Sequence, residues 1–198
     1  MRKLQSFIIA AFMCVVASSA QAVPTLLIDG GGQLIGADRV DVGGSLYDVR
    51  FGNGSCTGLF SGCNNAVDDF AFQTQAEGIV AAQALLDQVF IDNGSNLFDT
   101  EPETILGCSS VSTCQALIPV TLLTGGLLSN VITNNNNSIA GDTASSTLTL
   151  QRALSTASNG SRTYAVFTAS ASVPEPSVIA LFSVGLLGTF IAGRRFRT

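Results

Sequence analysis

The amino-acid sequence predicts an α+β fold, with a small antiparallel β-sheet, one main amphipathic helix and a separate apolar helix near the C-terminus. Short runs of alternating apolar and polar residues, separated by glycine or asparagine turns, indicate antiparallel strands. Only one segment, after Thr74, has apolar residues at helical spacing over several turns. A mostly-β sandwich with one crossing helix is the alternative fold.

Four strand-like runs precede the helix. Gly43-Gly44 separates two of them and suits a two-residue hairpin turn. Gly30-Gly31-Gly32 follows the first run; we interpret it as a turn, because the spacing of a phosphate-binding loop is missing. The predicted strands are residues 25–29, 39–42, 45–51 and 67–72.

The helix begins after Thr74, which lies three residues before Glu77 in the spacing of a capping box. Asn93-Gly94 is expected to end it. Its apolar stripe predicts a core-facing surface and consists of Ile79, Ala82, Leu86, Val89 and Phe90.

The second half of the domain begins with an acidic loop, residues 95–114, and continues with β-prone runs. Gly125-Gly126 and Asn159-Gly160 each separate two such runs and predict two further hairpins. The polar tract Asn134–Asn137 is interpreted as a surface turn. The predicted strands are residues 117–123, 127–133, 145–150 and 162–169.

Residues 1–22 have the pattern of a signal peptide. Arg2 and Lys3 precede an apolar run, and Ala20 and Ala22 form a small-x-small cleavage site for signal peptidase. The mature chain is therefore expected to begin at Val23. A permanent N-terminal anchor is the alternative, but the apolar run is short and the cleavage site is clear.

The C-terminal region, residues 174–198, has three parts in fixed order. Pro174, Glu175 and Pro176 form a stiff tripeptide, and residues 177–193 are uncharged. A helix of that length rises about 26 Å, near the lower limit for crossing a bilayer. The basic tail, Arg194, Arg195 and Arg197, favours a cytoplasmic end, which places the preceding chain outside the cytoplasm.

This three-part arrangement resembles the PEP-CTERM sorting signal of Gram-negative bacteria. The resemblance implies a membrane-embedded exosortase that recognises the Pro-Glu-Pro region, cleaves nearby and transfers the protein toward the cell surface, typically in bacteria that make exopolysaccharide. An ordinary membrane anchor with a proline-rich hinge is the alternative. The runs LYDVRF, SCTGLFSGC, DDFAF and AAQALLDQVF also resemble a set of exported PEP-CTERM proteins of unknown activity, which implies a shared fold and export but no catalytic residue.

Four cysteines remain after the signal peptide. Their even number and an oxidising compartment favour disulfides. Local pairs, Cys56–Cys63 and Cys108–Cys114, are preferred among the three possible connectivities because each closes a short polar loop. A zinc site is disfavoured, since the spacings do not fit and the chain has no histidine.

The predicted exported domain, residues 23–173, is acidic. It contains four arginines, no lysine and thirteen acidic residues, a formal net charge of −9. Such a domain would repel nucleic acid and anionic membrane surfaces. Solubility is the simplest interpretation of this charge, and cation binding is the other.

No residue set predicts catalysis. The absence of histidine removes the commonest general base, and the cysteines are assigned to disulfides. Asp68 and Asp69, as neighbours in a strand, would point to opposite faces, and Asp38 with Asp41 is a further carboxylate pair. The acidic turn at residues 92–99 departs from the EF-hand pattern, so no metal site is assigned.

The sequence therefore predicts a non-catalytic protein, without a cofactor, that is exported through the inner membrane and transiently anchored there by the C-terminal helix. Its expected partners are signal peptidase and exosortase, and its destination is the cell surface or the extracellular polysaccharide matrix. A small binding module for matrix polysaccharide, or for a cation such as calcium, is the alternative function.

Overall fold

The computed structural model describes residues 23–138 and 141–171. Within these residues, seven strands form one sheet, and one helix, α4, is longer than a single turn. The sheet strands are β1 (Thr25–Ile28), β2 (Leu34–Val42), β3 (Ser45–Gly52), β6 (Thr113–Leu123), β7 (Leu127–Asn136), β8 (Thr143–Gln151) and β9 (Arg162–Ala169). The other elements are α2 (Cys56–Leu59), α3 (Ala66–Asp69), α4 (Gln75–Gln88), β4 (Asp92–Asn93), β5 (Asn96–Leu97) and the 3-10 turns η1 (Pro102–Thr104), η2 (Thr124–Gly126) and η4 (Thr156–Ser158).

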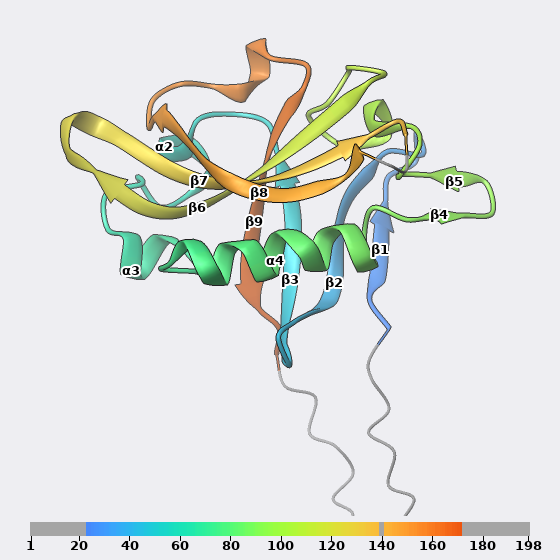
Figure 1. Cartoon of the computed structure of the whole chain (residues 1–198), viewed down its shortest axis with the longest axis horizontal. Helices are drawn as coiled ribbons and strands as arrows, with labels where there is room; N and C mark the ends of the chain where they lie inside the picture. Colours follow the sequence, from blue (N-terminus) through green and yellow to red (C-terminus); the bar gives the residue numbers. More distant parts are fainter. Residues whose placement is uncertain (1–22, 139–140, 172–198) are drawn as a thin grey trace, which may run out of the picture.

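The last strand of the sequence lies in the middle of the sheet. The strand order is β1-β2-β3-β9-β6-β7-β8, so β9 joins two three-stranded meanders. It pairs antiparallel with β3 and parallel with β6, and all other neighbours in the sheet are antiparallel. The start of β1, the β2–β3 turn and the end of β9 consequently lie at the same end of the sheet (Figure 1).

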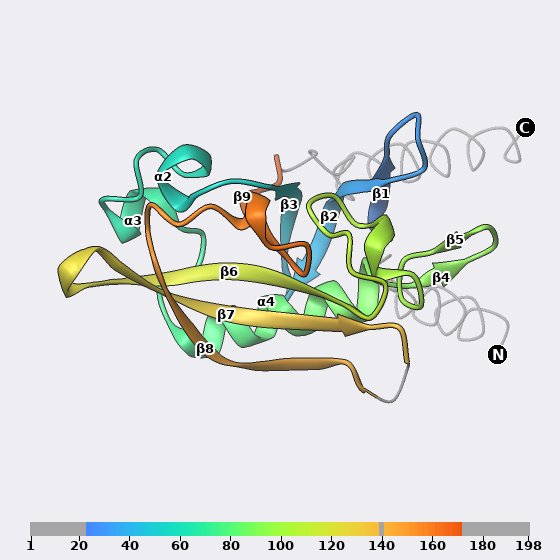
Figure 2. The same ribbon diagram turned by 90° about the horizontal axis from the view of Figure 1, so that it is seen from above.

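Helix α4 packs against β2, β6, β7 and β8, so the sheet curls around it (Figures 1 and 2). The predicted capping box is confirmed, with Thr74 accepting from the Glu77 N–H and Glu77 accepting from the Thr74 N–H. The helix ends at Gln88, earlier than predicted, because Asn93-Gly94 belongs to the β4–β5 hairpin. The predicted apolar stripe faces the core: Ala82, Val89 and Phe90 are buried, and Ile79 and Leu86 pack at its margin.

Gly78 allows α4 to approach the sheet closely. A Cβ atom at this position would lie 2.8 Å from both Val120 Cγ1 and Val131 Cγ2. Glycine lowers the stability of a helix by about 1 kcal/mol relative to alanine. The close contact with β6 and β7 explains why a glycine stands in the first turn despite that cost.

The opposite face of the sheet is covered by residues 53–70, not by a long helix. Phe60 and Phe70 pack edge-to-face, and Phe60 contacts Tyr164 of β9 in the same way. The prediction of a strand at residues 67–72 is wrong: Ala66–Asp69 form α3, because the Asn65 side chain accepts the Val67 N–H and caps a helical turn. A four-residue helix is too short to show helical periodicity in the sequence.

Two turn predictions in the second half are also wrong. Asn134 to Asn136 belong to β7, and Asn135 is fully buried with its Nδ2 donating to the Phe98 carbonyl at 2.7 Å. Asn159-Gly160 does not form a hairpin, since β8 pairs with β7 while β9 pairs with β3 and β6. The Gly160 carbonyl instead accepts from the N–H groups of Ser109 and Ser110, which holds the second cysteine loop.

The described residues thus form a mostly-β fold with one curled sheet, closer to the alternative than to the predicted α+β class. Strands are present at all the predicted ranges except residues 67–72. The β2–β3 hairpin turn has the two positive φ angles expected for Gly43 (60°) and Gly44 (90°). The fold departs from the α+β class because the strands are longer than predicted and join one sheet. The predicted membrane helix, residues 177–193, lies outside the described residues.

Candidate functional site

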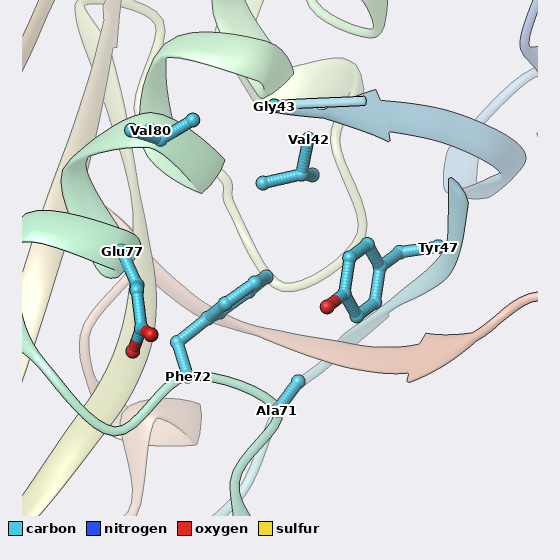
Figure 3. A pocket seen from close by; sticks show the side chains of 7 residues that line it. All are labelled: Val42, Gly43, Tyr47, Ala71, Phe72, Glu77 and Val80. Carbon is cyan, nitrogen blue, oxygen red and sulfur yellow. The ribbon is translucent and has the colours of Figure 1, made fainter. Parts of the chain in front are cut away.

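A shallow, mostly apolar pocket of about 230 Å³ lies beside the β2–β3 turn (Figure 3). Two of its residues come from the end of β2 and its turn, one from β3, and the others from the segment that leads into α4 and from α4 itself. The lining residues are Val42, Gly43, Tyr47, Ala71, Phe72, Glu77 and Val80.

The position of this pocket is fixed by a link between α4 and β2. The Gln88 side chain forms two hydrogen bonds with the backbone of Asp41: its Nε2 donates to the carbonyl at 2.7 Å, and its Oε1 accepts the N–H at 2.9 Å. Asp41 Oδ1 accepts the Gly44 N–H at 2.7 Å and stabilises the turn. These bonds hold one wall of the pocket against the other.

Aromatic rings form the floor. The Tyr47 and Phe72 centroids are 5.1 Å apart, and the Phe167 ring of β9 lies 5.1 Å from Phe72 and 6.2 Å from Tyr47. Phe72 is buried and Tyr47 is half-buried, whereas Val80 at the rim is 47% exposed. The pocket therefore offers aromatic and aliphatic surface to solvent.

The single carboxylate of the pocket already has partners. Glu77 Oε2 accepts the N–H groups of Gln73 at 2.9 Å and Thr74 at 3.0 Å. The Gln73 N–H, followed by the Thr74 groups, lowers the pKa of Glu77 below its ordinary value. Glu77 therefore acts as an ionised helix cap.

The end of β9 is anchored next to this pocket. The Ser170 N–H donates to the Leu46 carbonyl at 3.0 Å, and its hydroxyl donates to Asp48 Oδ1. The Ser170 hydroxyl, with the Arg39 N–H and the charges of Arg50 and Arg39, lowers the pKa of Asp48 although burial opposes this. Asp48 thus fixes the point at which the chain leaves the sheet.

Both predicted disulfides are confirmed. They lie in different hydrophobic cores, one on each face of the sheet. Cys56–Cys63 lies in the core between residues 53–70 and the sheet, and Cys108–Cys114 lies in the core around α4. Arg152 fixes the first loop, since its Nη1 donates to the Cys63 carbonyl at 2.9 Å. The burial of both disulfides suits a structural role.

The carboxylates considered for catalysis are all engaged in local structure. Asp68 accepts from the Asn65 side chain, and Asp69 Oδ2 accepts the N–H groups of Asn64 and Asn65. The expectation that Asp68 and Asp69 alternate across a strand is wrong, because both lie in α3. Asp38 forms an exposed ion pair with Arg50 at 2.6 Å, while Asp41 holds the β2–β3 turn.

The acidic turn at residues 92–99 forms the β4–β5 hairpin and the loop after it. Asp92 accepts the N–H groups of Asp99 and Thr100 and the Thr100 hydroxyl. Burial, then a hydrogen bond with Asp142, then the charges of Asp142 and Asp92, raise the pKa of Asp99 to about 6. Within residues 23–138 and 141–171, no three His, Cys, Asp or Glu side chains are grouped to hold a metal ion.

A polar ladder crosses four strands on the face opposite α4, and the sequence analysis missed it. Arg162 Nε donates to Gln115 Oε1 at 3.0 Å, and Gln115 Nε2 donates to Asn134 Oδ1 at 2.9 Å. Asn134 Nδ2 then donates to the hydroxyls of Thr143 (3.1 Å) and Ser145 (3.3 Å). Only the strand order brings these residues together, so no local sequence signal could reveal the ladder.

The remaining predicted site residues lie outside the part of the chain that the structure describes. They are the sorting tripeptide Pro174, Glu175 and Pro176, the basic residues Arg194, Arg195 and Arg197, and the cleavage-site residues Ala20 and Ala22. Val23, the predicted first residue of the mature chain, is 83% exposed. None of the helices in the described part has the length and hydropathy of a candidate membrane span.

Comparison with known proteins gives one match. Residues 172–195 fit the family model of the PEP-CTERM protein-sorting motif. No curated protein and no solved structure matches the chain significantly. The match covers the tripeptide, the apolar run and two of the arginines, and it confirms the resemblance found in the sequence. The chain therefore carries a PEP-CTERM sorting motif, which implies an exosortase as its processing partner and fits export toward the cell surface.

Proposed function

We propose that this is a non-catalytic protein that exosortase delivers to the cell surface or to the extracellular polysaccharide matrix. The observation that carries the proposal is the position of the sorting motif, which begins at residue 172, two residues after the anchored Ser170. The chain thus passes from the folded domain to the sorting motif almost without a linker. The signal peptide and the apolar run would anchor the protein in the inner membrane until it is processed.

The carboxylate partners support a non-catalytic role. Paired carboxylates in a glycosidase must face one substrate across a cleft, about 5–10 Å apart. Asp38, Asp41, Asp68 and Asp69 each accept hydrogen bonds within their own turn, helix or strand pair instead. A domain stabilised by two disulfides suits a passive role outside the cell.

The sorting proposal is tested by changing the tripeptide while leaving the membrane segment intact. In the double variant Pro174→Ala/Pro176→Ala, residues 177–193 can still enter the bilayer, because their burial drives insertion. Exosortase would meet a flexible tripeptide in place of a stiff one. The variant should accumulate uncut in the inner membrane, as measured by membrane fractionation and immunoblotting in a host that has its exosortase.

A matched variant separates recognition of the tripeptide by exosortase from orientation of the apolar run in the membrane. Replacing Arg194, Arg195 and Arg197 by glutamine should disturb orientation but leave the tripeptide readable. If the proline variant is released like the wild type, the C-terminal region is a plain anchor and the proposal is wrong.

A second candidate function, binding of matrix polysaccharide, is favoured by the polar ladder. Its amides, hydroxyls and guanidinium offer the donors and acceptors that sugar hydroxyls need. The charge distribution also suits it, because Asp142 is the only acidic residue between positions 104 and 171, so an acidic polymer would meet little repulsion there. The ladder residues are half-buried or exposed on the surface.

This second function is tested by affinity electrophoresis of the protein in gels that contain the host's own exopolysaccharide. Asn134→Ala should weaken retardation at least about fivefold, since one good polar contact contributes about 1 kcal/mol. Gln83→Ala is the matched control: Gln83 is an exposed residue of α4 whose side chain donates a hydrogen bond to Asp87 of the same helix. Equal retardation of both variants and the wild type would exclude the ladder as a binding surface.

A further inference from the structure

The chain leaves the folded domain beside the pocket at the β2–β3 turn. Ala169 of β9 is the register partner of Tyr47, and Ser170 is anchored to Leu46 and Asp48 of the same strand. Tyr47 also lines the pocket (Figure 3). The segment that follows Ala171 therefore begins two residues after Ala169, which lies directly beside the pocket residue Tyr47.

Chain length confines this segment to the same end of the domain. An extended residue spans at most about 3.5 Å, so the five residues from Ala171 to Pro176 reach about 17 Å. Residues 53–65 and the start of β9, where the ladder begins at Arg162, lie away from the end of β9 (Figure 1). Of the surfaces described above, the pocket is the one closest to the start of this segment.

The chemistry of the pocket suits a proline-rich strand better than a small molecule. Its volume of about 230 Å³ is below the roughly 300–1,000 Å³ of typical small-molecule sites. Its floor is aromatic, and its carboxylate is already engaged by backbone N–H groups. Aromatic-lined grooves bind proline-containing segments because such segments are stiff and lose little entropy on binding.

We propose that this pocket binds residues 173–176 of the same chain and so holds the sorting tripeptide against the domain. In a polyproline II conformation, with three residues per turn, Val173 and Pro176 project to the same side. Both then rest on Tyr47 and Phe72. Glu175 projects elsewhere, which keeps its charge away from Glu77.

This docking goes beyond the sorting function and holds whether or not the domain binds polysaccharide. It gives the tripeptide a defined position before the enzyme binds it. Exosortase would have to withdraw the segment from the pocket. The rate of processing would then depend on the domain as well as on the motif.

Photo-crosslinking of the full chain in detergent micelles tests the docking. Val80, at the pocket rim and 47% exposed, is replaced by p-benzoylphenylalanine, and fragment mass spectrometry locates the crosslinked residues. Crosslinks within residues 172–177 are expected. The matched control carries the probe at Leu154, which is 50% exposed and lies beyond the far end of β3, and should give at least fivefold less of this product.

A second variant isolates the contribution of the prolines. Adding Pro174→Ser and Pro176→Ser to the Val80 probe should reduce the crosslink to residues 172–177 at least fivefold. An unchanged yield would overturn recognition of the proline segment. Crosslinks from Val80 only to β9, to a second copy or to detergent would overturn the docking itself, even if sorting through exosortase is intact.

Discussion

The two faces of the seven-stranded sheet are covered in different ways. On one face, α4 is held by its capping box, by the two Gln88–Asp41 hydrogen bonds and by the close approach at Gly78. The other face is covered by the segment that contains two one-turn helices, α2 and α3. This segment is held in place by the Cys56–Cys63 disulfide and by aromatic contacts. Helices this short are marginally stable without tertiary support, so we expect the segment with α2 and α3 to unfold locally before α4 does.

Gly78→Leu should have the largest effect on the α4 face. The first side-chain carbon would already overlap Val120 and Val131, which cannot move without disturbing β6 and β7. Overpacking of a core typically costs 1–3 kcal/mol, and a leucine here should lower the free energy of unfolding by about 3 kcal/mol or more. Urea denaturation measures this. Ala76→Leu, at an exposed position of the same helix, is the control and should change stability little.

Removing the Cys56–Cys63 bridge should give the next largest effect, on the opposite face. A loop of this length contributes about 2–3 kcal/mol in the chain-entropy model. In Cys56→Ala/Cys63→Ala, hydrogen exchange should speed up in residues 53–70 while α4 stays protected. The matched variant Cys108→Ala/Cys114→Ala should leave residues 53–70 protected. Identical exchange patterns in the two variants would contradict the comparison.

Tyr164→Phe is expected to stabilise the same face. Tyr164 is fully buried, burial raises its pKa to about 12, and its hydroxyl has no hydrogen-bond partner within the described residues. An unpaired buried polar group costs about 1–3 kcal/mol, so its removal should raise the free energy of unfolding by about 1 kcal/mol. Thermal denaturation followed by calorimetry tests this. A lower midpoint than wild type would show that the hydroxyl has a partner.

Asp99→Asn should have the smallest effect, and only at higher pH. Because its pKa is raised from 3.8 to about 6, the folded state favours the protonated carboxyl. That contribution is fully present below about pH 4 and is lost as the pH rises through about 6. At pH 7 the variant should exceed wild-type stability by up to about 1 kcal/mol, since partial exposure screens the charge, and near pH 4 the two should match. A difference that is independent of pH would exclude this carboxyl as the cause.

The same comparison shows which parts of the fold could be predicted from sequence. The α4 face has local signals: the Thr74–Glu77 spacing marks the start of the helix, and Gly43-Gly44 marks the neighbouring turn. The opposite face has few local signals, because α3 is only one turn long. The only local sign of α3 is its capping residue Asn65. Its core is built from residues distant in sequence, such as Phe60 and Tyr164.

The candidate sites follow the same division. The sorting motif is contiguous, so its three parts could be predicted and were matched at residues 172–195. The pocket and the polar ladder depend on which strands are neighbours. Asn159-Gly160 suggested that β9 follows β8 in a hairpin, whereas β9 lies between β3 and β6. Because of that error, the sequence analysis could not predict that Ala169 lies beside Tyr47 or that Arg162 lies beside Gln115.

The intact mass of the protein recovered from the cell surface tests the central claim, sorting by exosortase, most directly. Top-down mass spectrometry under non-reducing conditions should give a chain that begins at Val23, lacks the apolar run 177–193 and contains both disulfides. The prediction rests on the cleavage site at Ala20 and Ala22 and on the sorting motif at residues 172–195. A surface protein that retains residues 177–198 would contradict processing by exosortase, and one that also begins at Met1 would contradict the export route as a whole.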